Sequence, residues 1–99
     1  MPPPRLAFTL FTKQYCGLCE HAKEALELIQ LKKLSKTPFT VTEIDIEKPE
    51  HKPWLRKYMY HVPVLHLGDQ MVARHRIEEG DILRILREVE GGERGDRGE

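Results

Sequence analysis

Runs of apolar and β-branched residues along the chain predict four strands. The nearly continuous apolar or β-branched run Leu6–Thr12 predicts a strand that is buried on both faces of a sheet. The β-branched run Phe39–Ile46 predicts a second strand. His61–Leu67 and Gln70–Arg74 predict two further strands. The two-residue link Gly68-Asp69 between them is typical of an antiparallel hairpin.

Three other segments carry apolar residues at helical spacing. One stripe predicts an amphipathic helix from about Gly17 to Leu34. A short second helix should begin around Glu50. Pro49 and Pro53 lie near this point, and proline is tolerated only in a first helical turn. A terminal helix is predicted from the apolar residues between Ile82 and Val89. The order is therefore β-α-β-α-β-β-α, and the first helix should connect two parallel strands in a right-handed unit.

The length of 99 residues is sufficient for a single domain. We expect a short N-terminal extension at residues 1–5 and one folded domain at residues 6–90. The last nine residues, 91–99, contain four glycines and lack apolar residues. They predict a disordered tail.

The charge balance limits the classes of partner. Sixteen basic residues balance sixteen acidic ones, so the formal net charge is zero, which argues against a nucleic-acid-binding protein. The sequence lacks a run of 18 apolar residues, and its start has no hydrophobic run of the length of a signal peptide, so we expect neither a membrane span nor a signal peptide. We expect an intracellular monomer, in the cytoplasm by default, with the mitochondrion left open.

Two cysteines carry the candidate chemistry, in the sequence Cys16-Gly17-Leu18-Cys19. A bond between them closes so short a loop that it would add little to stability. Cys16 falls at the predicted helix N-terminus, where unpaired N–H groups favour a thiolate. Lys13 can add positive charge, and Cys19 lies within one turn of Cys16. This spacing suits a two-step dithiol exchange.

Two other interpretations of the cysteine pair come from the residues alone. One is a pair of buried, inert thiols, and the other is half of a zinc site completed by His21. We expect no metal site, because the chain has no second cysteine pair. Most of the five histidines should be structural, and they are His21, His51, His61, His66 and His75. His61 is either an exposed loop residue or, when protonated, a stabiliser of the Cys16 thiolate.

These motifs together resemble a known fold. The Cys-x-x-Cys after the first strand, the βαβ unit, Val62-Pro63 before a hairpin and the closing helix resemble the thioredoxin fold. The small size, with Lys13 three residues before Cys16, resembles glutaredoxin, and most closely its small glutaredoxin-like branch. The resemblance spans about Leu6–Val89. It implies a thioredoxin-like α/β domain with a four-stranded mixed sheet flanked by three helices.

The resemblance also implies an activity and a site. It implies a thiol–disulfide oxidoreductase in which Cys16 attacks a protein disulfide or glutathionylated cysteine and Cys19 resolves the mixed disulfide. Pro63 would be cis, so that the Val62 backbone N–H and C=O could pair with an incoming peptide. Lys13 would help to hold the carboxylate of glutathione, which acts as co-substrate. We expect no tightly bound cofactor.

Three features differ from the usual glutaredoxin pattern. Gly17-Leu18 stands where Pro-Tyr is usual, and His61 stands where threonine is common. The segment Ala73–Asp81 has one Gly-Asp pair but lacks the Gly-Gly that holds the γ-glutamyl end of glutathione. The resemblance therefore leaves two alternatives to an oxidoreductase. They are an iron–sulfur cluster carrier bridging two protomers, favoured by the small Gly17, and a thioredoxin-fold adapter without turnover.

Overall fold

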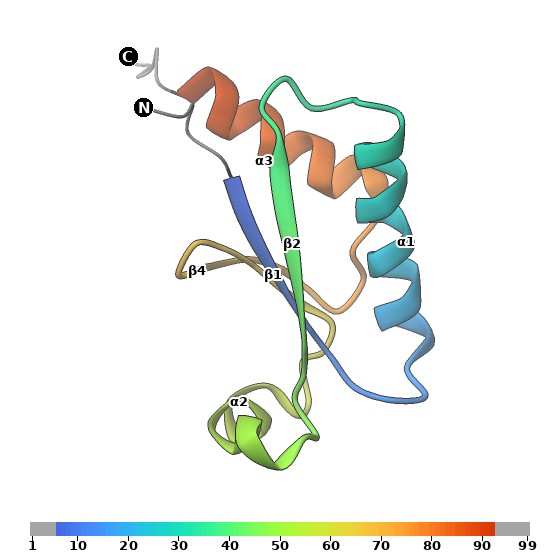
Figure 1. The fold of residues 1–99 in the computed structure, drawn as a ribbon, viewed down its shortest axis with the longest axis vertical. Coiled ribbons are helices and arrows are strands. Elements are labelled where there is room, and N and C mark those ends of the chain that lie inside the picture. Colours follow the sequence, from blue (N-terminus) through green and yellow to red (C-terminus); the bar gives the residue numbers. More distant parts are fainter. Residues whose placement is uncertain (1–5, 93–99) are drawn as a thin grey trace.

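The computed structural model describes residues 6–92 and contains the seven predicted elements plus one short 3₁₀ turn. The predicted element order β-α-β-α-β-β-α is confirmed (Figure 1). The elements are β1 (Leu6–Thr12), α1 (Gly17–Leu31), β2 (Phe39–Asp45), the turn η1 (Pro49–His51), α2 (Lys52–Tyr58), β3 (Val64–Leu67), β4 (Gln70–Arg74) and α3 (Glu79–Gly92).

The four strands form one mixed sheet in the order β2-β1-β3-β4. β1 and β2 are parallel, as the crossover through α1 requires, and the other two pairs are antiparallel. Phe11 on β1 pairs with Val64 on β3, which pairs in turn with Arg74 on β4. The end of β1, the start of β3 and the end of β4 therefore lie at the same end of the sheet.

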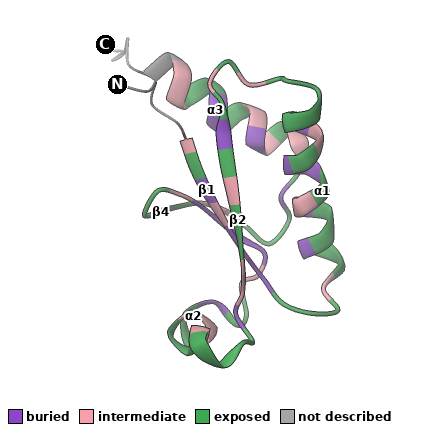
Figure 2. Cartoon of the chain, in the orientation of Figure 1, coloured by how far each residue is buried: buried purple, intermediate pink, exposed green. Residues whose placement is uncertain are grey.

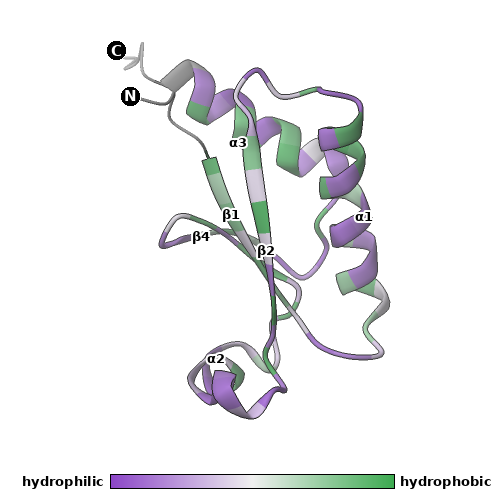
Figure 3. Cartoon of the chain, viewed as in Figure 1, coloured by the Kyte–Doolittle hydropathy of each residue, from purple (hydrophilic) through white to green (hydrophobic). Residues whose placement is uncertain are grey.

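The two faces of the sheet bury two separate apolar clusters. The larger one contains Phe8 and Leu10 of β1 with apolar residues of α1 and α3, including Leu26 and Ile82. The smaller one comprises Phe11, Ile46, Tyr58 and Val64. Successive strand residues point to opposite faces, so β1 contributes to both clusters. Figures 2 and 3 show the buried, apolar positions of α1 and α3 on their sides toward the sheet.

The prediction that β1 is buried on both faces holds only for its second half. Phe8, Leu10 and Phe11 are buried, but Ala7 is exposed and Thr9 is half-buried. These two residues lie on the same face as Phe11. α2, which covers that face, is only seven residues long and lies at the lower end of the sheet in Figure 1. The first half of β1 is therefore covered on one face only.

α1 ends at Leu31, three residues before the predicted Leu34. Lys33 adopts the left-handed conformation with φ at 55°. Its N–H donates to the carbonyl of Gln30, and the N–H of Leu34 donates to the carbonyl of Ile29. These two bonds are those of a Schellman motif, in which glycine is the usual residue at the position of Lys33.

β1 and β4 have the predicted bounds, and several other boundaries differ from prediction by one to three residues. β3 begins at Val64 rather than His61, because Pro63 has no N–H to donate to the ladder. α3 extends to Gly92, two residues into the segment predicted to be a tail. The remainder of that segment, 93–99, and the predicted extension 1–5 lie outside the described residues. Within residues 6–92, every helix is too short or too polar to cross a membrane.

Candidate active site

Cys16 and Cys19 form a disulfide at the start of α1, with their Cα atoms 5.2 Å apart. Cys16 is the N-cap of the helix, with extended backbone angles. Its Sγ accepts a hydrogen bond of 3.1 Å from the backbone N–H of Cys19. The sulfur therefore lies where the first N–H groups of a helix favour negative charge. This is the strand-to-helix junction that the sequence predicts.

The two cysteines differ in their access to solvent. The Cys19 side chain is 1% exposed, whereas Cys16 is half-buried. The neighbouring Leu18 is 42% exposed. Tyr15 is fully exposed and has φ at 57°, a conformation that is uncommon for an aromatic residue. An incoming molecule can therefore reach Cys16 before Cys19, across an exposed and partly apolar surface.

The loop before Cys16 is attached to the segment that follows β2. The N–H of Ile46 donates to the carbonyl of Thr12 at 2.9 Å, and the N–H of Gln14 donates to Glu47 Oε1 at 3.3 Å. Lys13 lies between these two attachment points and is exposed. The structure thus holds Lys13 at the end of β1 that leads to the cysteines.

Val62 and Pro63 lie at the same end of the sheet, directly before β3. Their peptide bond is cis, the isomer that the resemblance implies. Pro63 is fully buried and Val62 is half-buried. The carbonyl of Pro63 accepts a hydrogen bond of 2.7 Å from the N–H of His75, which follows β4. Register therefore brings the cysteine loop, the Val62-Pro63 segment and His75 to one end of the molecule.

His61 and His75 form a pair that sequence reasoning identified only in part. Their ring centroids are 5.6 Å apart in an edge-to-face arrangement. His61 Nδ1 is buried and has no hydrogen-bond partner among the described residues. His75 has φ at 68°, which histidine tolerates better than most residues. His75 comes to lie beside Pro63 only through the register of β3 and β4, so the sequence around His75 did not predict this contact.

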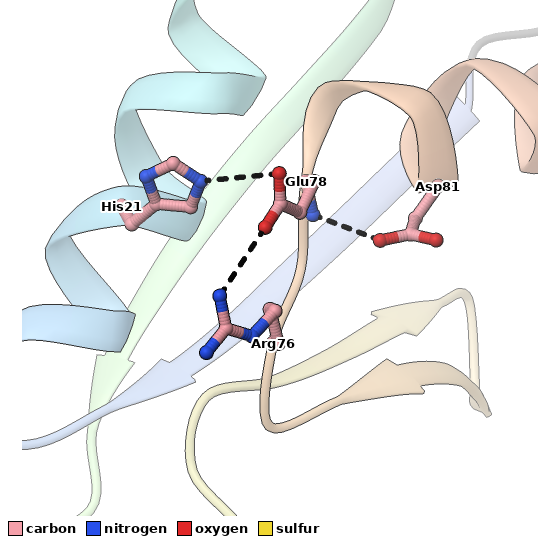
Figure 4. A network of polar contacts seen from close by, with 4 residues as sticks. All are labelled: His21, Arg76, Glu78 and Asp81. Carbon is pink, nitrogen blue, oxygen red and sulfur yellow. Dashed lines mark hydrogen bonds and ion pairs between the residues drawn. The ribbon is translucent and has the colours of Figure 1, made fainter.

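A second polar network links α1 to the segment that leads into α3 (Figure 4). Glu78 lies between His21 of α1, whose Nε2 is 3.8 Å from Glu78 Oε1, and Arg76, whose Nη1 is 3.7 Å from Glu78 Oε2. The N–H of Glu78 donates to Asp81 Oδ2 at 3.0 Å. This bond is one half of a capping box, for which the Glu-x-x-Asp spacing was an available signal. The segment Ala73–Asp81, which lacks the Gly-Gly of glutaredoxins, thus carries its own carboxylates.

The described residues contain no group of three or more His, Cys, Asp or Glu side chains placed to hold a metal ion. His21, considered above as a zinc ligand, contacts Glu78 instead. The arrangement that the structure does supply is a bridged cysteine pair with one accessible sulfur at a helix N-terminus.

Comparison with known proteins agrees with this geometry. Residues 7–87 match the model of the family described as Glutaredoxin-like domain (DUF836). The chain is also 34% identical over 82 residues to the glutaredoxin-like protein YDR286C homolog of Dictyostelium discoideum. That alignment covers 79% of this chain and 76% of the relative.

Solved structures show the fold. A malarial protein superposes with a TM-score of 0.63 at 19% identity, covering 86% of this chain and 97% of the other. Thioredoxin-2 of the malaria parasite superposes with a TM-score of 0.61 at 19% identity, covering 85% and 82%. The predicted thioredoxin-like fold is therefore confirmed.

Proposed function

Because the chain belongs to the glutaredoxin-like domain family, we propose that it is a thiol–disulfide oxidoreductase in which Cys16 attacks and Cys19 resolves. The observation that carries this proposal is the Cys16–Cys19 disulfide at the N-terminus of α1, with one accessible and one buried sulfur. The accessible thiol is the one at the helix cap, where a thiolate is favoured. The buried thiol can reach only its neighbour.

The reaction proceeds by two exchanges of sulfur bonds. The Cys16 thiolate attacks one sulfur of a substrate disulfide, forms a mixed disulfide and displaces the other substrate sulfur as a thiolate. Cys19, as a thiolate, then attacks Cys16 Sγ. This step releases the reduced substrate and leaves the Cys16–Cys19 disulfide. Two electrons from an external thiol reductant, such as two molecules of glutathione, restore both thiols.

Exposed apolar residues beside Cys16 and beside the Val62-Pro63 segment support a protein as the substrate. Tyr15 precedes Cys16, Leu18 lies between the two cysteines, and Met59 and Tyr60 precede the Val62-Pro63 segment. All four side chains are between 39% and 101% exposed. Exposed apolar side chains around a reactive group mark interaction sites. In this proposal the backbone of Val62 pairs with the extended peptide beside its disulfide.

Glutathione has one favourable and one unfavourable feature at this site. The exposed Lys13 can attract a glutathione carboxylate. The entry to α3 carries Glu78, Glu79 and Asp81, and Asp81 already caps that helix. These carboxylates disfavour the binding of another negatively charged group, such as a glutathione carboxylate, at that place. We therefore propose a protein disulfide as the main substrate and glutathione as a reductant.

The test compares wild type, Cys16→Ser and Cys19→Ser on two substrates, a glutathionylated peptide and a protein disulfide, each with glutathione as reductant. Cys16→Ser should be inactive on both. Cys19→Ser should keep activity on the glutathionylated peptide, where glutathione can resolve the intermediate, and lose activity on the protein disulfide. Activity of Cys16→Ser comparable to wild type would overturn the assignment of the nucleophile. Absence of turnover by wild type, also with thioredoxin reductase as electron source, would overturn the proposed function.

A further inference from the structure

Ser35, the only serine of the chain, connects the loop after α1 to the end of α3. Its hydroxyl lies 3.0 Å from Glu90 Oε2 and also close to the carbonyl of Thr37, so one proton serves two acceptors. The N–H of Thr37 donates to the same Glu90 oxygen at 2.8 Å. In Figure 1 the loop between α1 and β2 lies next to α3. A single carboxylate oxygen thus holds this loop, which we call the 32–38 loop.

Three lysines lie close to Ser35 in the chain. Lys32 and Lys33 precede it by three and two residues, Lys36 follows it, and all three are exposed. Lys33, Ser35 and Lys36 line a hollow of about 300 Å³. Ser35 therefore donates a hydrogen bond to a carboxylate and also lines an open hollow bordered by two lysines.

We propose that Ser35 is a phosphorylation site for a serine kinase with an acidic peptide-binding groove, and that phosphorylation releases the 32–38 loop from α3. In this step Ser35 Oγ attacks the γ-phosphorus of ATP in the kinase active site. The bond to ADP breaks, ADP leaves, and the hydroxyl proton passes to a base of the kinase. The basic residues before Ser35 complement an acidic groove, since kinases select substrates by their charge pattern.

The change of charge explains the release. A phosphoserine carries a charge of about −1.5 to −2 near neutral pH and places three acceptor oxygens where a hydroxyl was. It cannot donate to Glu90, and its charge repels that carboxylate. Lys33 and Lys36 attract it from the hollow, which has room for the group. The side chain therefore turns toward the lysines, and the Thr37 N–H loses its acceptor as the loop moves away.

This switch is independent of the proposed thiol chemistry. Cys16 precedes α1 and Ser35 follows it. The 15 residues of the helix separate them by about 22 Å at a rise of about 1.5 Å per residue. A Cys16→Ser chain should therefore be phosphorylated at the same rate as wild type.

The first experiment tests the site. The full chain is incubated with ATP and a kinase that prefers basic residues before its serine, and in parallel with a kinase that prefers acidic surroundings. Mass spectrometry should locate one phosphoryl group on Ser35 with the first kinase. The Lys32→Gln, Lys33→Gln double variant should be modified at least about fivefold more slowly, because it removes the charge complementarity. Modification confined to threonines, or an equal rate with both kinases, would overturn the site.

The second experiment tests the release. A chain with phosphoserine incorporated at position 35 during translation is compared with wild type by amide hydrogen exchange. The Thr37 amide should exchange about tenfold faster or more, since it loses a charge-assisted hydrogen bond. Glu90→Gln should reduce the difference between the phosphorylated and unmodified chains, because it removes the repulsion. An unchanged exchange rate at Thr37 in the phosphorylated chain would overturn the release.

Discussion

The hydroxyl of Tyr58 lies 2.6 Å from Nε2 of His66, and this contact joins α2 to β3 inside the protein. Both side chains are about 6% exposed. The His66 ring also packs against Phe11 and Trp54, with ring centroids 4.8 and 5.8 Å away. Burial lowers the pKa of His66 below its ordinary value of 6.5, and the positive charge of Lys57 adds to this effect. The lowered pKa favours the neutral imidazole at pH 7, whose Nε2 can accept a hydrogen bond from the Tyr58 hydroxyl.

Replacing Tyr58 by phenylalanine should destabilise the protein. The substitution keeps the ring but leaves the buried Nε2 of His66 without its partner, which costs about 1–3 kcal/mol. Urea unfolding followed by far-UV circular dichroism measures the change in the free energy of unfolding. Tyr60→Phe is the matched control, because Tyr60 is 80% exposed and should change stability by less than about 0.5 kcal/mol. Equal effects of the two variants would contradict the structural importance of the contact.

The pKa of His66 also predicts how stability depends on pH. Because the pKa is lowered on folding, the unfolded chain binds more protons between the folded value and 6.5. The contribution of His66 to stability is complete above pH 6.5 and is lost as pH falls toward the folded pKa. The slope from this one group should reach up to about 1.4 kcal/mol per pH unit.

Urea midpoints measured between pH 8 and pH 5 test this dependence. His66→Gln keeps an acceptor for Tyr58 but does not titrate, so the fall in stability below pH 6.5 should be smaller in that variant. His21→Gln, a change at the surface, should leave the fall intact. The same acid-induced fall in wild type and His66→Gln would show that other groups produce it.

Alkylation should distinguish the two cysteines of the reduced protein. Cys16 is half-buried at the helix cap, whereas Cys19 is 1% exposed, so iodoacetamide should modify Cys16 first. Peptide mapping after a short reaction measures the partition between the two sites. In urea the two cysteines should react at similar rates, which provides the control. Faster alkylation of Cys19 in the folded protein would reverse the proposed roles.

Two glycines should respond to alanine in opposite directions. Gly68, in the β3–β4 turn, has φ at 62°, so alanine there should cost about 1–2 kcal/mol through backbone strain. Gly80 lies in the first turn of α3, where alanine should stabilise by about 0.5–1 kcal/mol through helix propensity. An added Cβ meets nothing within 4 Å at either position, so packing does not confuse the comparison. Thermal unfolding measures both changes, and a shift of the same sign would contradict this account.

Lys13 should affect one class of substrate more than the other. If its charge attracts a glutathione carboxylate, Lys13→Gln should raise the KM for a glutathionylated peptide several-fold and leave that for a protein disulfide nearly unchanged. Lys36→Gln, which lies beyond the other end of α1, serves as the control with no expected effect. Equal increases for both substrates would assign Lys13 a general structural role.

The sequence predicted the elements well because each carries its own period or turn residues. β1 and β4 have the predicted bounds, since apolar and polar residues mark both ends. The end of α1 was missed because Lys33, rather than glycine, occupies the left-handed position after it. The one-sided burial of β1 also could not be predicted. It depends on how far the short helix α2 extends over the sheet.

The candidate site was predictable only where its residues are close in the sequence. The Cys16-x-x-Cys19 spacing and Val62-Pro63 were visible as motifs. The contacts of His75 with Pro63 and of Glu78 with His21 join residues at least 12 positions apart, and only the folded register brings them together. The Tyr58–His66 pair was missed for a different reason, because neither residue looks unusual in its local sequence.

The unequal sizes of the two apolar clusters have a consequence for local unfolding. Four buried residues hold α2 to the sheet, whereas twelve buried residues form the cluster that α1 and α3 share with it. Opening events that break few buried contacts have low free energies, so α2 and the adjoining Val62-Pro63 segment should unfold locally far more often than the whole chain. The larger cluster would then act as an independent folding unit that keeps α1 and the disulfide at its start in place. The proposed peptide-binding side of the active site would meanwhile sample other conformations.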